Sequence, residues 1–139
     1  MNEERIQLEA DKDVVAAWKS GLSMGRKLGF GQFKQACLSG AILELSRNLV
    51  ERGDRGACVI SDASDDGMLR ARVVIESTLP SAADVARQRL STEMNIAPGV
   101  PAVRLQSVVE TCDVQSRPDS TRIVFTINQQ RASRPALRR

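Results

Sequence analysis

The 139-residue sequence contains no histidine and no tyrosine, and it has only three phenylalanines, one tryptophan and three cysteines. Without histidine there is no cysteine–histidine pair for nucleophilic catalysis, and the usual zinc ligand sets are incomplete. The small number of aromatic side chains argues against a stacking platform for single-stranded nucleic acid. Carboxylate, amide and hydroxyl side chains are therefore the main candidates for a functional site.

The cysteines Cys37, Cys58 and Cys112 are odd in number, far apart and without a CxxC pair. This usage is typical of reduced thiols in a cytoplasmic protein. All three fall within expected helices or strands, so we expect small buried side chains. Long apolar runs are also absent and the first residues are charged, which argues against export and against a membrane span.

Positive charge is concentrated at the end of the chain. Residues 131–139, RASRPALRR, hold four arginines and no acid. Since the whole chain has a formal net charge of +3, residues 1–130 alone carry −1. We expect a single domain at 1–130, large enough for an ordinary core, and a disordered basic tail at 131–139.

Two amphipathic helices are predicted in the first half of the chain. The first is capped by Asp11 or Asp13 and runs to about Leu28, before the GFG break at 29–31. Its apolar positions are Val14, Val15, Trp18, Leu22 and Leu28. The second helix runs from about Gln32 to Arg52, and Gly53 ends it. Its buried stripe is Leu38, Ile42, Leu45 and Leu49.

Strands arranged as hairpins follow these helices. The turn DASDDG joins the first pair, where Asp62, Asp65 and Asp66 suit a turn better than a metal cluster. The expected elements are strands at 57–61 and 69–76, helices at 82–90 and about 100–109, and strands at 112–115 and 122–127. This order predicts a two-layer α/β sandwich with a mostly antiparallel sheet and helices on one face, and it excludes a doubly wound fold.

Glu44 and Asn48 interrupt the flank of the second helix's apolar stripe. One turn apart, they are separated by about 40° around the helix axis and share one edge of the stripe. An asparagine oxygen is a neutral ligand for Mg²⁺, and a carboxylate nearby can accept the proton of an attacking hydroxyl. The alternative is that both are partly exposed polar residues at the boundary of a helix.

Two segments resemble the RsbT-type serine-protein kinases of bacterial stressosomes, which are Bergerat-fold (GHKL) ATPases. They are KLGFGQFKQA at Lys27–Ala36 and AILELSRN at Ala41–Asn48, within a resemblance that extends over residues 5–127. The resemblance implies an α/β sandwich that uses ATP and Mg²⁺. It implies that Asn48 binds the metal and that Glu44 activates the substrate serine.

The remaining nucleotide-binding segments differ from the family pattern. The resemblance places Ser77, Ser81, Thr92 and Gly99 in the nucleotide site. Residues 77–81, STLPS, stand where the family has Asp-x-Gly-x-Gly, so the adenine-binding aspartate and two glycines are replaced. The lid segment at 91–103 keeps Thr92 and Gly99 but has fewer glycines than the family's lid.

Three functional hypotheses follow. The first is a partner-switching kinase that phosphorylates a serine of a STAS-domain protein. The second is a catalytically inactive relative that acts only by binding a STAS protein or the regulatory domain of a phosphatase. The third is a small nucleic-acid-binding regulator that uses the arginine-rich tail.

Overall fold

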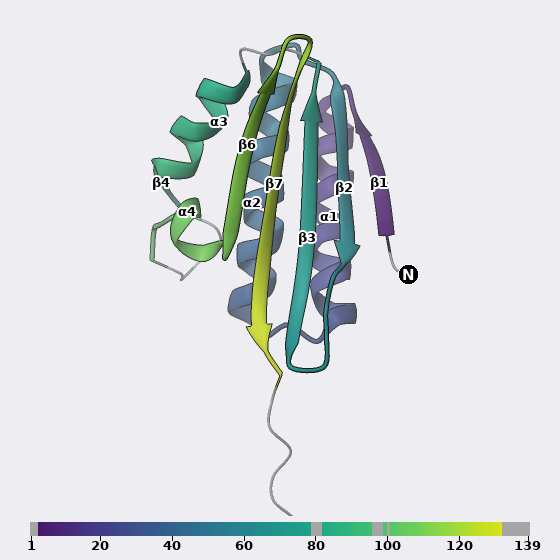
Figure 1. Ribbon diagram of the computed structural model, residues 1–139, viewed down its shortest axis with the longest axis vertical. Coiled ribbons are helices and arrows are strands. Elements are labelled where there is room, and N and C mark those ends of the chain that lie inside the picture. The colour runs from purple at the N-terminus through teal and green to yellow at the C-terminus, as the bar shows by residue number, and fades with distance from the viewer. Residues whose placement is uncertain (1–2, 79–81, 96–98, 100, 132–139) are drawn as a thin grey trace, which may run out of the picture.

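The computed structural model describes residues 3–78, 82–95, 99 and 101–131 (Figure 1). The elements, in chain order, are β1 (Glu3–Leu8), α1 (Asp11–Leu28), α2 (Gln32–Glu51), β2 (Gly56–Asp62), β3 (Met68–Ser77), α3 (Ala82–Ser91), β4 (Glu93–Met94), β5 (Val103–Arg104), α4 (Leu105–Val108), β6 (Thr111–Arg117) and β7 (Ser120–Gln130).

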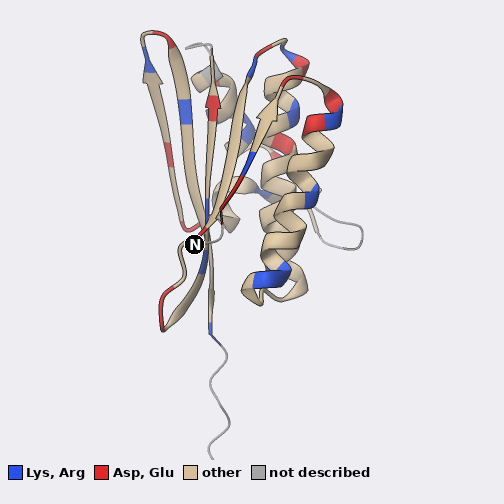
Figure 2. Cartoon of the chain, turned by 90° about the vertical axis from the view of Figure 1, so that its right-hand side faces the viewer, with Lys and Arg blue, Asp and Glu red and all other residues tan. Residues whose placement is uncertain are grey.

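The centre of the fold is a five-stranded sheet in the order β1-β2-β3-β7-β6, and every neighbouring pair is antiparallel. Helices α1 and α2 lie side by side against one face of this sheet, while no described helix covers the other face (Figure 2). The predicted α/β class with a mostly antiparallel sheet is therefore confirmed. Both predicted hairpins, β2–β3 and β6–β7, are also confirmed.

Strand β1 was not predicted from the sequence. It pairs antiparallel with β2 at the edge of the sheet, in the register Glu3↔Ser61 to Leu8↔Gly56. Its only fully buried side chain is Leu8, and the exposed positions along it are charged or polar. An edge strand buries few side chains, so its sequence EERIQL carries little of the apolar alternation on which strand prediction depends.

The boundaries of α1 and α2 agree with the sequence predictions. Gly29 takes a left-handed conformation with φ 93° at the end of α1, and Gly53, with φ 75°, follows α2. Neither Asp11 nor Asp13 is the N-cap, which was the prediction; that position is Ala10. Asp13 instead accepts hydrogen bonds from the backbone amides of Glu9 and Ala10, at 2.9 and 3.0 Å. It thereby satisfies amides before the first turn.

The face that α1 buries differs from the predicted one. Gly21 lies so close to α2 that a Cβ there would be 2.8 Å from Ile42 Cδ1, and this contact sets the rotation of the helix. The buried positions are Val14, Ala17, Gly21, Met24 and Gly25. Val15, one of the apolar positions predicted for this helix, is 47% exposed and lies outside the buried face. Trp18, Leu22 and Leu28 are half-buried.

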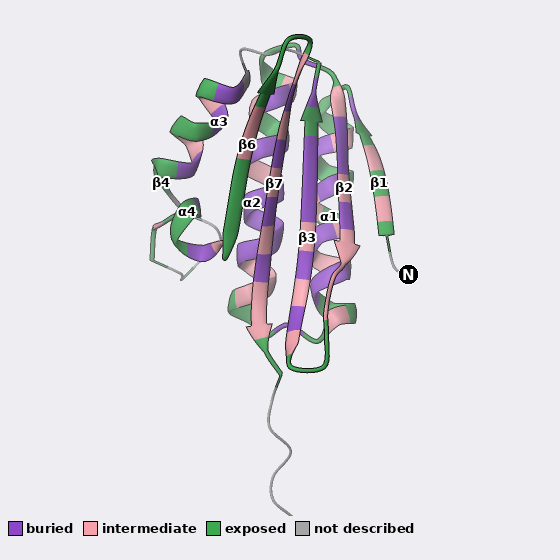
Figure 3. Ribbon diagram, viewed as in Figure 1, coloured by how far each residue is buried: buried purple, intermediate pink, exposed green. Residues whose placement is uncertain are grey.

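The core lies between the sheet and α1 and α2 (Figure 3). The predicted α2 stripe is confirmed, because Leu38, Ile42, Leu45 and Leu49 are all buried there.

Cys37 and Cys58 are buried as expected, and burial raises their pKa values to about 11 and about 12. Cys112 is exposed, contrary to the prediction, because it lies on the edge strand β6. The buried thiols of Cys37 and Cys58 are therefore protonated at neutral pH.

The helix predicted at 100–109 was wrong in extent. Among the described residues of this segment, only α4, Leu105–Val108, is helical, since Val103 and Arg104 are extended and pair with Met94 and Glu93. Pairing between β4 and β5 outweighs the helical propensity of this segment. The β4–β5 pairing joins the two ends of the segment predicted as a lid, 91–103.

The DASDDG segment forms a turn, as predicted. Asp65 Oδ1 accepts hydrogen bonds from the amides of Gly67 and Met68, at 3.0 and 2.9 Å, and these bonds hold the pKa of Asp65 below its usual value. Arg131 also contacts this turn through Nε, which donates to Asp65 O at 2.8 Å. The remainder of the predicted tail, residues 132–139, lies outside the described residues.

Candidate functional site

A cavity of about 220 Å³ lies between α2 and α3, and Asn48 lines it from α2. The side chain of Asn48 is half-buried and makes no hydrogen bond within the described part of the chain. Its carboxamide oxygen and nitrogen are therefore available to a ligand in the cavity. The predicted site residue Thr92 lines the same cavity.

One face of α3 and the residue after it supply the opposite wall: Val85, Gln88, Arg89 and Thr92. The spacing i, i+3, i+4, i+7 places these residues on one side of a helix. Thr92 is held by its hydroxyl, which donates to Gln88 O at 2.8 Å. Arg89 is half-buried, and its guanidinium forms no hydrogen bond or ion pair with the described residues. It gives the cavity a positive charge.

Arg89 was not singled out in the sequence. The sequence does contain a pattern that could have indicated it: Gln88, Arg89 and Thr92 are polar residues at helical spacing, in and just after the helix predicted at 82–90. Because charged residues on a short helix usually face solvent, that pattern alone does not distinguish a ligand-binding face from an exposed one.

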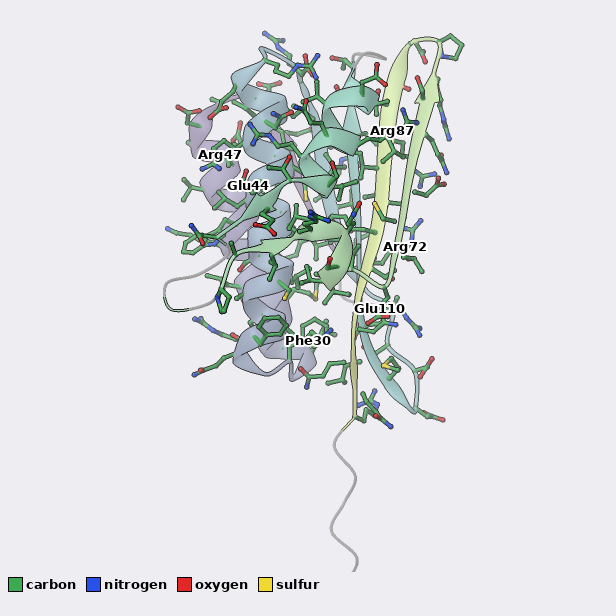
Figure 4. All side chains as sticks on the ribbon, turned by 90° about the vertical axis from the view of Figure 1, so that its left-hand side faces the viewer. Phe30, Glu44, Arg47, Arg72, Arg87 and Glu110 are labelled. Atoms are coloured by element: carbon green, nitrogen blue, oxygen red, sulfur yellow. The ribbon has the colours of Figure 1, made fainter. Side chains whose placement is uncertain are left out.

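Glu44 lies one turn before Asn48 on α2, as the sequence predicted. Its side chain is 14% exposed and forms an ion pair with Arg47, whose own side chain is 46% exposed (Figure 4). Arg47 Nε also lies 3.9 Å from Glu51 Oε1. Glu44 does not line the cavity that Asn48 and Thr92 share. The Glu44 carboxylate thus lies one helical turn from the Asn48 cavity and is paired with Arg47 of the same helix.

Ser77 is placed apart from the Asn48 cavity. It is the last residue of β3, is 4% exposed, and its hydroxyl donates to Asp54 Oδ2 at 3.2 Å. Asp54 itself is 2% exposed and lies in the connection between α2 and β2. The pairing of Ser77 with Asp54 could not be predicted from the sequence, because the two residues are 23 positions apart and meet only in the folded chain.

Gly99 and Ser81 are the two remaining predicted site residues. Gly99 has φ 78°, a conformation that favours glycine, and it is exposed. Ser81 lies outside the described residues.

Two further properties of the described chain bear on the site. Within it, no group of three or more His, Cys, Asp or Glu side chains could hold a metal ion. Mg²⁺ in proteins commonly completes its coordination with water and with the oxygens of a bound phosphate. Among the described helices, none has the length and apolar composition of a membrane span.

The fold and the cavity define a small α/β protein with an antiparallel sheet and a polar site between two helices. No family model matches the chain. It is 29% identical over 102 residues to the serine/threonine-protein kinase RsbT of Bacillus subtilis (strain 168), an alignment that covers 71% of this chain and 77% of that kinase. The chain is thus an RsbT-type relative, as the sequence resemblance predicted.

Proposed function

We propose that this chain is a partner-switching regulator of a bacterial stress response that transfers the γ-phosphoryl group of ATP to a serine of a STAS-domain protein. In this proposal it is a Bergerat-fold (GHKL) kinase with Asn48 and Glu44 as its central residues. The similarity to RsbT supports the class of activity. The observation that carries the proposal is the Asn48 side chain, which has no hydrogen-bond partner among the described residues and lines a polar cavity with Arg89 and Thr92.

The residues around this cavity fit the phosphate end of a magnesium nucleotide. The carboxamide oxygen of Asn48 is a hard, neutral ligand, and the Arg89 guanidinium is suited to phosphate oxygens. At about 220 Å³ the cavity is smaller than most small-molecule sites, which span roughly 300 to 1,000 Å³, so it accommodates the polyphosphate rather than the whole nucleotide. Mg²⁺, when bound, neutralises charge on the phosphates during transfer.

In this proposal Glu44 acts on the substrate serine and not on the nucleotide. Its carboxylate orients the hydroxyl of the incoming serine and accepts its proton. The ion pair with Arg47 holds this carboxylate in the resting chain. Since Arg47 is half exposed, an approaching partner can draw it away and release Glu44.

A second candidate function is a binding-only relative that acts by occupying a STAS protein or the regulatory domain of a phosphatase. The observation that favours it is the engagement of Glu44 by Arg47, together with the replacement of the adenine-binding aspartate by Ser77. Under this alternative the fold and the partner surface are retained without phosphoryl transfer.

The test is incubation of the full chain with ATP, Mg²⁺ and a STAS-domain stressosome protein of the same organism, followed by mass spectrometry of the STAS protein. We expect a phosphoserine that requires both ATP and Mg²⁺. Stable binding of the two proteins without phosphoserine would support the binding-only alternative. Neither binding nor phosphorylation across the organism's STAS proteins would refute both candidates.

A further inference from the structure

Arg47 is a half-exposed arginine that contacts two carboxylates of its own helix. It forms an ion pair with Glu44 (Figure 4), and its Nε lies 3.9 Å from Glu51 Oε1. The Glu51 contact is longer than a hydrogen bond and Glu51 is exposed, so this contact holds the guanidinium weakly. Among the described residues Arg47 has no further hydrogen bond or ion pair. N–H groups of its guanidinium are therefore open to an acceptor from another molecule.

The order of side chains around α2 places Glu44 between Asn48 and Arg47. At about 100° per residue, Asn48 lies about 40° from Glu44 in one direction around the helix axis, and Arg47 lies about 60° from it in the other. A serine hydroxyl bound at Glu44 therefore has the Asn48 cavity on one side and Arg47 on the other. Partner residues that flank this serine on the side away from the nucleotide come to lie over Arg47.

Drawing the guanidinium of Arg47 away from Glu44 requires an anion. The contact between the two side chains is charge-assisted, which makes it roughly twice as strong as one between neutral groups, so a neutral acceptor does not compete. The phosphates of a nucleotide are one anionic source, but Arg47 does not line the Asn48 cavity, where Arg89 supplies the positive charge. A carboxylate of the protein partner is the source that remains, and it can accept two parallel hydrogen bonds from a guanidinium.

We propose that Arg47 determines which partner serine is phosphorylated, by binding an aspartate or glutamate of the partner that flanks this serine. The inference rests on the proposed phosphoryl transfer and names the feature of the partner that permits it. Before docking, Arg47 pairs with Glu44. After docking, Arg47 pairs with the partner's carboxylate, and the Glu44 carboxylate is free to accept the proton of the serine hydroxyl. A partner with lysine or arginine at the flanking position is repelled, which gives the site its specificity.

The test measures phosphorylation of the STAS-domain protein by the full chain and by Arg47→Gln, with separate KM values for the STAS protein and for ATP. We expect the KM for the STAS protein to rise about tenfold or more, since a hydrogen-bonded ion pair is lost. The KM for ATP should not change, because Arg47 lies outside the cavity. Arg47→Lys keeps the charge without the parallel hydrogen bonds, so it should restore part of the affinity. Arg26→Gln, at an exposed arginine of α1, is the matched control and should keep the wild-type KM.

The acidic residue of the partner is found by replacing each aspartate and glutamate near the phosphoserine with its amide. At one such position the effects of the partner replacement and of Arg47→Gln on KM should not add, because each removes the same ion pair. An unchanged KM for the STAS protein in Arg47→Gln, a rise in the KM for ATP alone, or additive effects at every position would overturn the role of Arg47 and leave the proposed kinase standing. Absence of phosphoserine with the wild-type chain would overturn both.

Discussion

Replacement of Asn48 by alanine is expected to lower phosphoryl transfer to the STAS-domain partner by about a hundredfold or more. The cavity has no other side-chain oxygen that can serve as a metal ligand from α2, since its remaining described lining residues, Val85, Gln88, Arg89 and Thr92, come from α3 or directly follow it. Loss of one preorganised group that stabilises transition-state charge typically costs about 10²- to 10³-fold in rate. The rate of phosphoserine formation at saturating ATP measures the effect.

Binding of the partner should change little in the Asn48→Ala variant, because the half-buried side chain lines the cavity between α2 and α3. Gln32→Ala is the matched control: it removes an exposed carboxamide from the same helix and should keep the wild-type rate. Retention of wild-type phosphorylation by Asn48→Ala would remove this residue from the mechanism.

The largest effect on stability is expected at Gly56, the first residue of β2. A Cβ at this position would be 1.7 Å from the carbonyl oxygen of Glu76 and 2.8 Å from its carbonyl carbon. Because both atoms belong to the backbone of β3, Gly56→Ala must push apart the strand ends where Gly56 pairs with Ser77. We expect a loss of about 3 kcal/mol or more in the free energy of unfolding, at the upper end for overpacking. Chemical denaturation measures this loss.

Gly67→Ala provides the comparison for Gly56→Ala. Gly67 lies in the β2–β3 turn, where an added Cβ would meet nothing closer than Asp65 Oδ1 at 3.9 Å. Its φ is not positive, so alanine is tolerated and should change the stability by less than about 1 kcal/mol. If both variants unfold at the same denaturant concentration as the wild type, the close backbone contact between Gly56 and Glu76 would be contradicted.

Local signals explain why much of the helical layer could be predicted from the sequence. Gly29 and Gly53 adopt left-handed conformations that end their helices, and the stripe from Leu38 to Leu49 is buried as a unit. These features depend on residues a few positions apart, where helix periodicity and capping are decisive. The positions of Glu44 and Asn48, one turn apart on α2, could be predicted for the same reason.

Features that depend on contacts between distant segments were missed or wrong. Val15 was counted among the apolar positions of α1, but it is 47% exposed because the helix turns Gly21 toward Ile42 of α2. Val103 and Arg104 were assigned to a helix, but they pair with β4. The burial of Asp54 could not be predicted from the sequence, because it arises only when the end of α2 packs against the end of β3.

The central claim is that Asn48 belongs to a magnesium–nucleotide site, and calorimetric titration with a non-hydrolysable ATP analogue tests it most directly. We expect saturable binding by the full chain that strengthens with Mg²⁺, and loss of that strengthening in Asn48→Ala. The same affinity with and without Mg²⁺, or no binding at millimolar analogue, would contradict the claim.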